Sequence, residues 1–66
     1  MSRKYVVTIR NLSEKVDKDI VVKGVNPMEV HKTAFMSTKN NEEIMAICDE
    51  SNEIVYDLED GFRRSY

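Results

Sequence analysis

His31 and Cys48 are the two residues of this chain whose side chains could serve as a general base and a nucleophile. A histidine that deprotonates a cysteine thiol is a common arrangement in covalent catalysis. Such a pair also needs an orienting group and donors for a developing oxyanion, and no motif in the sequence supplies either. A lone histidine on the apolar side of a helix and a lone cysteine in a strand more often serve packing. We therefore predict that the chain is not an enzyme and has no catalytic residue.

The acidic run from Asp49 to Glu53 carries oxygen ligands at alternate positions, as the start of a calcium loop does. The sixth position of such a loop would be Ile54, where a glycine is needed, and the twelfth would be Asp60, where a bidentate glutamate is usual. The run is typical of a solvated hairpin turn. The two glycines are isolated, and one cysteine with one histidine cannot complete a structural zinc site. We predict no metal and no cofactor.

Charge is sorted along the chain. Residues 3–39 contain eight basic and four acidic side chains, whereas residues 40–60 contain eight acidic side chains and no lysine or arginine. The net charge of −2 therefore conceals a strong dipole. Local fields steer partners more than total charge does, so the pattern indicates binding rather than chemistry.

The length of 66 residues predicts one domain over 1–66, including a short basic and aromatic tail over 61–66. A chain of about 60 residues buries only about 60% of the surface that its unfolded form exposes. A single cysteine excludes an internal disulfide, so self-association or docking on a larger partner is the expected source of extra stability. The N-terminal residues show no signal peptide, and no apolar run approaches the roughly 20 residues of a membrane span. These features predict a cytoplasmic protein with no membrane partner.

Apolar periodicity predicts an α+β fold of order ββαββ, in which one helix lies on one face of a small antiparallel or mixed four-stranded sheet. The helix has the clearest local signal: Asn26 is a favoured N-cap, Pro27 suits the first helical position, and Glu29 can return a hydrogen bond to the cap backbone. The expected elements are strands over 4–10 and 19–23, a helix over 27–38, and strands over 43–48 and 53–58.

Strict strand alternation assigns side chains to the two faces of this sheet. The more continuously apolar set is expected under the helix: Tyr5, Val7, Ile9, Ile20, Val22, Ile44, Ala46, Cys48, Ile54, Tyr56 and Leu58. The other face would carry Val6, Val21, Met45, Ile47 and Val55. Its rim would be basic over the first hairpin and acidic over the second. An apolar centre inside a charged rim is typical of an interface, so we predict a homodimer or partner surface here. A few exposed valines on a small protein remain the alternative.

Two classes of function are consistent with these features. The first is a non-enzymatic interaction protein that regulates or inhibits a macromolecular partner. In its most specific form, the acidic second hairpin, over residues 43–58, fills the basic nucleic-acid-binding cleft of a partner protein. In size and build alone, the chain looks like small inhibitors and antitoxins of phages and mobile elements. The acidic residues expected to contact the partner are Glu43, Asp49, Glu50, Glu53 and Asp57.

The second class is direct binding of nucleic acid by the basic first hairpin and the tail. The tail combines guanidinium groups with aromatic rings, which both stack on bases and bind phosphate. Its residues are Phe62, Arg63, Arg64 and Tyr66. A sequence pI near 5.3 weighs against this class, because nucleic-acid-binding domains are usually basic.

Overall fold

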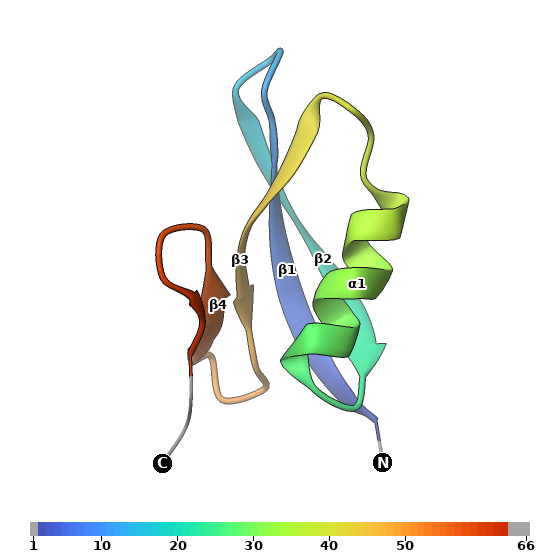
Figure 1. The fold of residues 1–66 in the computed structure, drawn as a ribbon, viewed down its shortest axis with the longest axis vertical. Helices are drawn as coiled ribbons and strands as arrows, with labels where there is room; N and C mark the ends of the chain where they lie inside the picture. The colour runs from blue at the N-terminus through green and yellow to red at the C-terminus, as the bar shows by residue number, and fades with distance from the viewer. Residues whose placement is uncertain (1, 64–66) are drawn as a thin grey trace.

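The structure, a computed structural model, describes residues 2–63, which form one antiparallel sheet with one helix against it (Figure 1). In chain order the elements are β1 Arg3–Asn11, β2 Val16–Gly24, α1 Pro27–Ser37, β3 Glu42–Cys48, β4 Ile54–Asp57 and β5 Gly61–Phe62. The strands lie in the order β2-β1-β3-β4-β5. The fold is therefore a small α+β domain as predicted, although the described residues form a five-stranded sheet and not a four-stranded one.

The first hairpin is longer than the sequence pattern suggested, because its turn is tight. Asn11 accepts hydrogen bonds at its side-chain Oδ1 from the backbone N–H groups of Ser13 and Glu14, at 2.9 and 2.8 Å. The Lys15 N–H donates to the Asn11 carbonyl at 2.7 Å, and Lys15 has a φ of +56°. The polar residues 12–15 thus form a tight turn, and β2 begins at Val16.

The helix begins where its cap predicts. Asn26 Oδ1 accepts from the Glu29 N–H at 2.8 Å, which confirms the N-cap. The Glu29 carboxylate accepts from the N–H of Val25 at 3.2 Å, whereas the sequence predicted a bond to the Asn26 N–H. The helix ends at Ser37, one residue before the predicted end, because Thr38 leaves the helical conformation and donates its N–H to the Phe35 carbonyl.

The predicted assignment of β3 side chains to the two faces of the sheet is wrong in part, because the strand contains a bulge. Thr8 lies opposite Ala46 and Ile9 lies opposite Ile44, so Met45 is an extra residue in the ladder. A bulge reverses the alternation beyond it. Ile47 therefore points toward the helix and is fully buried, whereas Ala46 shares the opposite face with Thr8.

A second irregularity, between Ile47 and Cys48, together with the bulge at Met45, corrects three further assignments. Ile47 pairs with Tyr56 and Cys48 pairs with Ile54, which leaves Val55 unpaired between them. Val55 is buried with the core and is not part of the outer face. Cys48 lies opposite Val6 on β1, so Cys48 and its partner Ile54 are on the outer face and not under the helix. The observed core consists of Tyr5, Val7, Ile9, Val30, Ala34, Ile44, Ile47 and Val55.

Part of the predicted tail belongs to the sheet. Gly61 has a φ of +74°, which a glycine adopts without strain, and it turns the chain back so that Phe62 pairs with Tyr56. The Arg63 N–H donates to the Val55 carbonyl at 2.8 Å. The tail residues 64–66, which include the predicted contacts Arg64 and Tyr66, lie outside the described residues.

Candidate functional site

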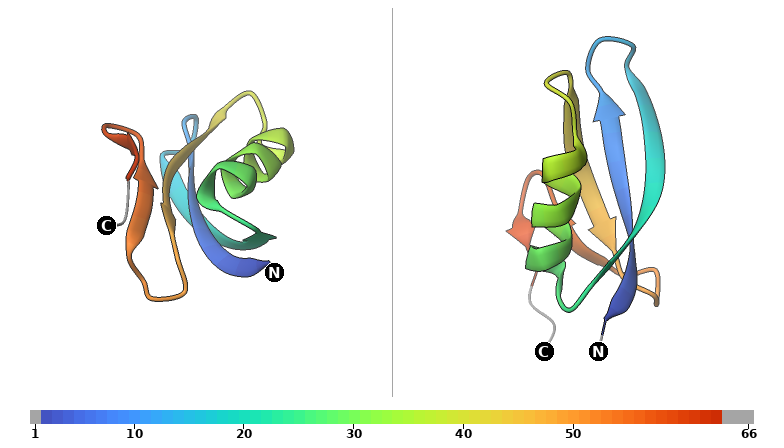
Figure 2. Two further views of the ribbon diagram at one scale, coloured as in Figure 1. Left: turned by 60° about the horizontal axis from the view of Figure 1, so that its bottom comes forward. Right: turned by 90° about the vertical axis from the view of Figure 1, so that its right-hand side faces the viewer.

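A groove lies on the helix side of the sheet, where α1 leaves β4 and β5 uncovered. The helix packs mainly on β1, β2 and β3 (Figure 2). A hollow of about 380 Å³ opens beside it. Its walls are formed by the turn between β1 and β2, by α1, by β3, by β4 and by the turn that follows β4. The lining residues are Leu12, His31, Phe35, Glu42, Glu43, Ile44, Tyr56 and Leu58.

Four rings join the two walls of the groove, and we call them the aromatic cluster: His31, Phe35, Tyr56 and Phe62. The His31 ring meets Tyr56 edge-on, with ring centroids 4.7 Å apart, and meets Phe62 edge-on at 5.6 Å. Tyr56 and Phe62 lie 4.8 Å apart, and Phe35 stacks on the His31 ring at 6.2 Å. Edge-to-face pairs at these distances are favourable, so His31 holds α1 to β4 and β5.

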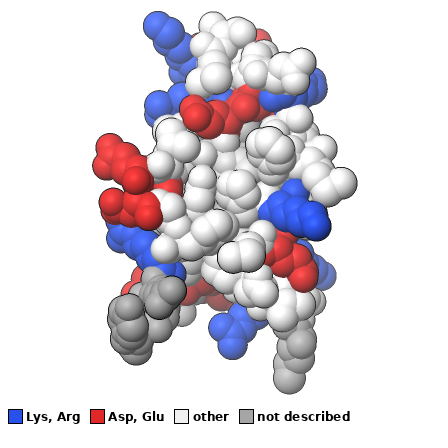
Figure 3. Space-filling model, in the orientation of Figure 1, with Lys and Arg blue, Asp and Glu red and all other residues white. Residues whose placement is uncertain are grey.

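Large apolar side chains within the cluster and beside it are exposed. Phe35 is 63% exposed, and Leu12, Leu58 and Phe62 are exposed as well. A smaller hollow of about 260 Å³ lies beside Phe62 at the start of the helix and is lined partly by Met28. In the orientation of Figure 1, the area between α1 and β4 carries few charges, and acidic and basic side chains lie around its edge (Figure 3). A broad exposed apolar area with a polar border marks an interaction site.

The acidic side chains at the groove differ in how firmly they are held. The Glu42 carboxylate accepts from the Lys39 N–H at 2.9 Å and pairs with the Lys18 ammonium at 3.1 Å, and its side chain is only 7% exposed. The backbone hydrogen bond, followed by the Lys18 contact, lowers the pKa of Glu42 below its ordinary value. Glu42 is therefore ionised at neutral pH and links the groove to Lys18 on β2, while Glu43 pairs with Arg10 in the ladder of β1 and β3 and lines the wall.

The predicted partner-binding acids are not gathered into one row. Glu43 is at the beginning of β3, and Glu50 and Glu53 are exposed around the turn at its other end. Asp49 Oδ1 accepts from the N–H groups of Ser51 and Glu53, at 2.9 and 3.0 Å, which fixes that turn.

Asp57, the last of these acids, is also held by its own turn. Its Oδ1 accepts from the Asp60 N–H at 2.7 Å, and its Oδ2 pairs with the Arg63 guanidinium at 2.8 Å. The Asp60 bond, and then Arg63, lower the pKa of Asp57. Arg63 also lies 3.4 Å from the Asp60 carboxylate.

On the outer face, Val6 and Val21 lie opposite each other and are exposed, as predicted, while Met45 at the bulge is half-buried. Val6 and Val21 line a shallow hollow of about 490 Å³ with Lys4 and the turn residues Asp49, Glu50 and Asn52. Within the chain itself, the Lys4 N–H lies 3.4 Å from the Glu50 carboxylate. This contact uses the backbone of Lys4, whereas the ion pair between Lys18 and Glu42 joins the basic and acidic segments within one molecule.

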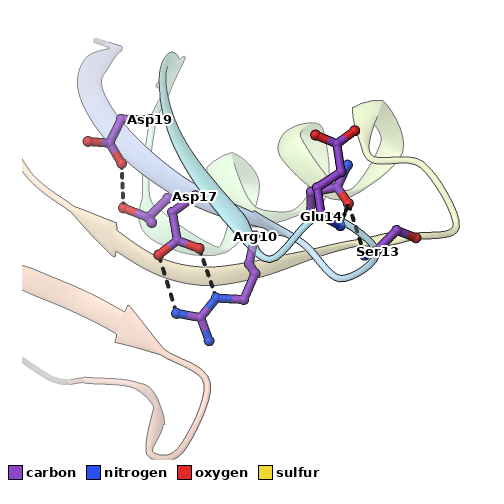
Figure 4. Close-up of polar contacts among 7 residues, drawn as sticks. Arg10, Ser13, Glu14, Asp17 and Asp19 are labelled. Carbon is purple, nitrogen blue, oxygen red and sulfur yellow. Dashed lines mark hydrogen bonds and ion pairs between the residues drawn. The ribbon is translucent and has the colours of Figure 1, made fainter.

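The rim of the first hairpin is less basic than expected, because two aspartates share it. Arg10 and Asp17 form a two-point ion pair, with an Arg10 Nε to Asp17 Oδ1 distance of 2.8 Å (Figure 4). The pair raises the pKa of Arg10 and lowers that of Asp17. The Thr8 hydroxyl donates to Asp19 at 2.8 Å. The charge of Arg10 is therefore balanced within the first hairpin.

His31 and Cys48 are on opposite faces of the sheet, since His31 contacts Tyr56 on the helix side and Cys48 lies beside Val6 on the outer face. Within residues 2–63 no cluster of histidine, cysteine or carboxylate side chains is suited to a metal ion. The same residues contain no helix with the length and apolarity of a membrane crossing. No protein-family model, curated protein or solved structure matches this chain.

Proposed function

We propose that this chain is a non-enzymatic interaction protein that takes an apolar segment of a partner protein into the groove between α1 and β4–β5, and so regulates or inhibits that partner. The observation that supports this most directly is that the groove-lining residues Leu12, Phe35 and Leu58 are exposed, as is Phe62 of the aromatic cluster. Interfaces derive most of their affinity from a few large apolar or aromatic side chains in a desolvated centre.

The chemistry of the groove favours a protein segment over nucleic acid. Its polar lining includes the carboxylates of Glu42 and Glu43, which repel phosphate groups. Elsewhere, Arg10, Lys18 and Arg63 each hold a carboxylate of the chain itself, so phosphates would have to displace those partners. A partner segment with apolar anchors and a neutral or basic flank fits both the rings and the carboxylates. The acidic hairpin then contributes to orientation and not to the main contact.

The experiment compares one variant from each wall of the groove with a control on the same helix. Phe35→Asp and Leu58→Asp each place a carboxylate in the groove. Met36→Asp is the matched control, because Met36 follows Phe35, is 78% exposed and does not line the groove. Tagged proteins are expressed in the source cells, captured after cross-linking and quantified by mass spectrometry, with circular dichroism as the check on folding.

A specific partner should be recovered with the wild type and with Met36→Asp. Loss of a central contact typically costs at least about 2 kcal/mol, which corresponds to about a 30-fold weaker affinity. Recovery with Phe35→Asp and with Leu58→Asp should fall accordingly. Equal recovery with all four proteins would show that the groove is not the binding surface.

A further inference from the structure

The strand β2 is an open edge of the sheet. It pairs with β1 along Val16–Gly24, and no other described strand lies on its far side (Figure 2). An open edge presents unpaired N–H and C=O groups to any strand that can approach. A short strand, a proline, a bulge or charged side chains usually protect such an edge. β2 spans nine residues without a proline, and its register with β1 is continuous, so its charged side chains are the protection it has.

The central residues of β2 are complementary to themselves when read antiparallel. If a two-fold axis passes through Val21, this residue lies opposite Val21 of a second copy. Ile20 then lies opposite Val22, and Asp19 lies opposite Lys23, on both sides of the axis. These five central positions therefore join apolar with apolar or acid with base, and each residue keeps its face of the sheet; beyond them, Lys18 lies opposite Gly24. Such cross-strand pairs are the favourable ones in antiparallel sheets.

Neighbouring registers that also leave each side chain on its own face of the sheet give less favourable cross-strand pairs. An axis through Ile20 sets Asp19 against Val21 and Lys18 against Val22. An axis through Val22 sets Val21 against Lys23. Axes through Asp19 or Lys23 set like charges directly opposite each other, which is destabilising. The charge pattern thus selects the register centred on Val21.

We propose that the chain forms a homodimer in which β2 pairs with β2 of a second copy about a two-fold axis at Val21, so that the two sheets become one continuous sheet. This places Val21, which is 65% exposed in the single chain, at the centre of the contact. Val6 lies directly behind it on β1 and extends the apolar strip across the outer face. Backbone hydrogen bonds supply affinity, and the Asp19 and Lys23 pairs select the register.

The dimer is independent of the proposed groove. β2 is at one end of the strand order and β4–β5 is at the other, so the grooves of both copies stay open. Failure of either proposal therefore leaves the other standing.

The test is sedimentation equilibrium over a range of concentrations. The wild type should show twice the monomer mass of 7.7 kDa. Val21→Asp, which sets two carboxylates against each other, should sediment as a monomer. Val16→Asp is the control, because Val16 is on the same strand and lies beyond the paired segment in this register. It should remain a dimer.

A charge exchange tests the register itself. Asp19→Lys and Lys23→Asp each create two like-charged pairs and should weaken dimerisation by about tenfold, because like charges directly opposite each other destabilise paired strands. The double variant Asp19→Lys with Lys23→Asp should restore it. A monomeric wild type, a double variant as weak as the single ones, or a dimer broken by Val6→Asp but not by Val21→Asp would overturn the proposal.

Discussion

Of the two glycines, Gly24 is the one where an added methyl group would meet a neighbouring side chain. It is buried at the end of β2, and a Cβ placed on it would lie 2.5 Å from the Val30 Cγ2 atom. Val30 is itself fully buried, so it has little room to retreat. Overpacking of this kind costs about 1–3 kcal/mol. Gly24→Ala should therefore lower the free energy of unfolding by that amount, although alanine otherwise suits a strand better than glycine does.

A double-mutant cycle shows whether the close approach to Val30 is the cause. Val30→Ala removes two methyl groups and leaves a cavity, at a cost of about 2–3 kcal/mol. In that background the nearest atoms to the new Cβ are the Glu29 Oε1 and the Val30 backbone nitrogen, both at 3.4 Å, which the site can accommodate. Gly24→Ala should then be neutral or stabilising by up to about 1 kcal/mol.

The assay is urea unfolding followed by circular dichroism, with all four proteins at one chain concentration. Sulfate is added equally to each if Val30→Ala is too unstable to give a folded baseline, because sulfate strengthens apolar burial. The coupling between the two sites should exceed about 1 kcal/mol. Independent sites add to within about 0.5 kcal/mol, so additivity at that level would refute the steric explanation.

Three further changes probe the core, the cap and the ionised groups. Ile47→Ala should cost about 2–5 kcal/mol in urea unfolding, since Ile47 is fully buried, whereas Ile54→Ala on the exposed face should cost far less; equal costs would contradict the bulge in β3. Asn26→Ala should cost about 1 kcal/mol by thermal or urea unfolding, and Asn26→Asp, which keeps the acceptor, should recover most of it. The lowered pKa of Glu42 in the folded protein means that its contribution is complete above about pH 4.3, the ordinary glutamate pKa, and is lost as the pH falls through the lower folded value. Glu42→Gln should therefore reduce the loss of stability between pH 7 and pH 3, and an unchanged slope would show that this ion pair has no such role.

Local signals predicted the helix well because each is contained in a few neighbouring residues. Asn26, Pro27 and Glu29 set its start, and the structure changes only the backbone group that Glu29 contacts. The strand faces were harder, since one extra residue reverses every assignment beyond it. Met45 has no glycine or proline beside it that would mark the bulge, so Ile47 was assigned to the wrong face.

The groove could not be read from the sequence, because it depends on how distant segments meet. Phe35 follows His31 by one helical turn, and this spacing is the one local signal for an aromatic stripe on α1. Tyr56 and Phe62 become part of the same cluster only through the strand order and through the short strand β5. Gly61 is the one residue in the sequence that marks the turn into β5, and a strand of two residues is too short to give a periodic pattern.

The separation of basic and acidic residues along the chain can be explained by contacts within one molecule, without a binding partner. The strand order sets β1 between β2 and β3, so segments of opposite charge become neighbours in the sheet. Lys18 forms an ion pair with Glu42 across that boundary, and the backbone N–H of Lys4, though uncharged, approaches the Glu50 carboxylate. Since these contacts are made within one chain, the dipole does not by itself call for an external partner. Binding must be sought where apolar groups remain uncovered, which is at the groove and at the open edge of β2.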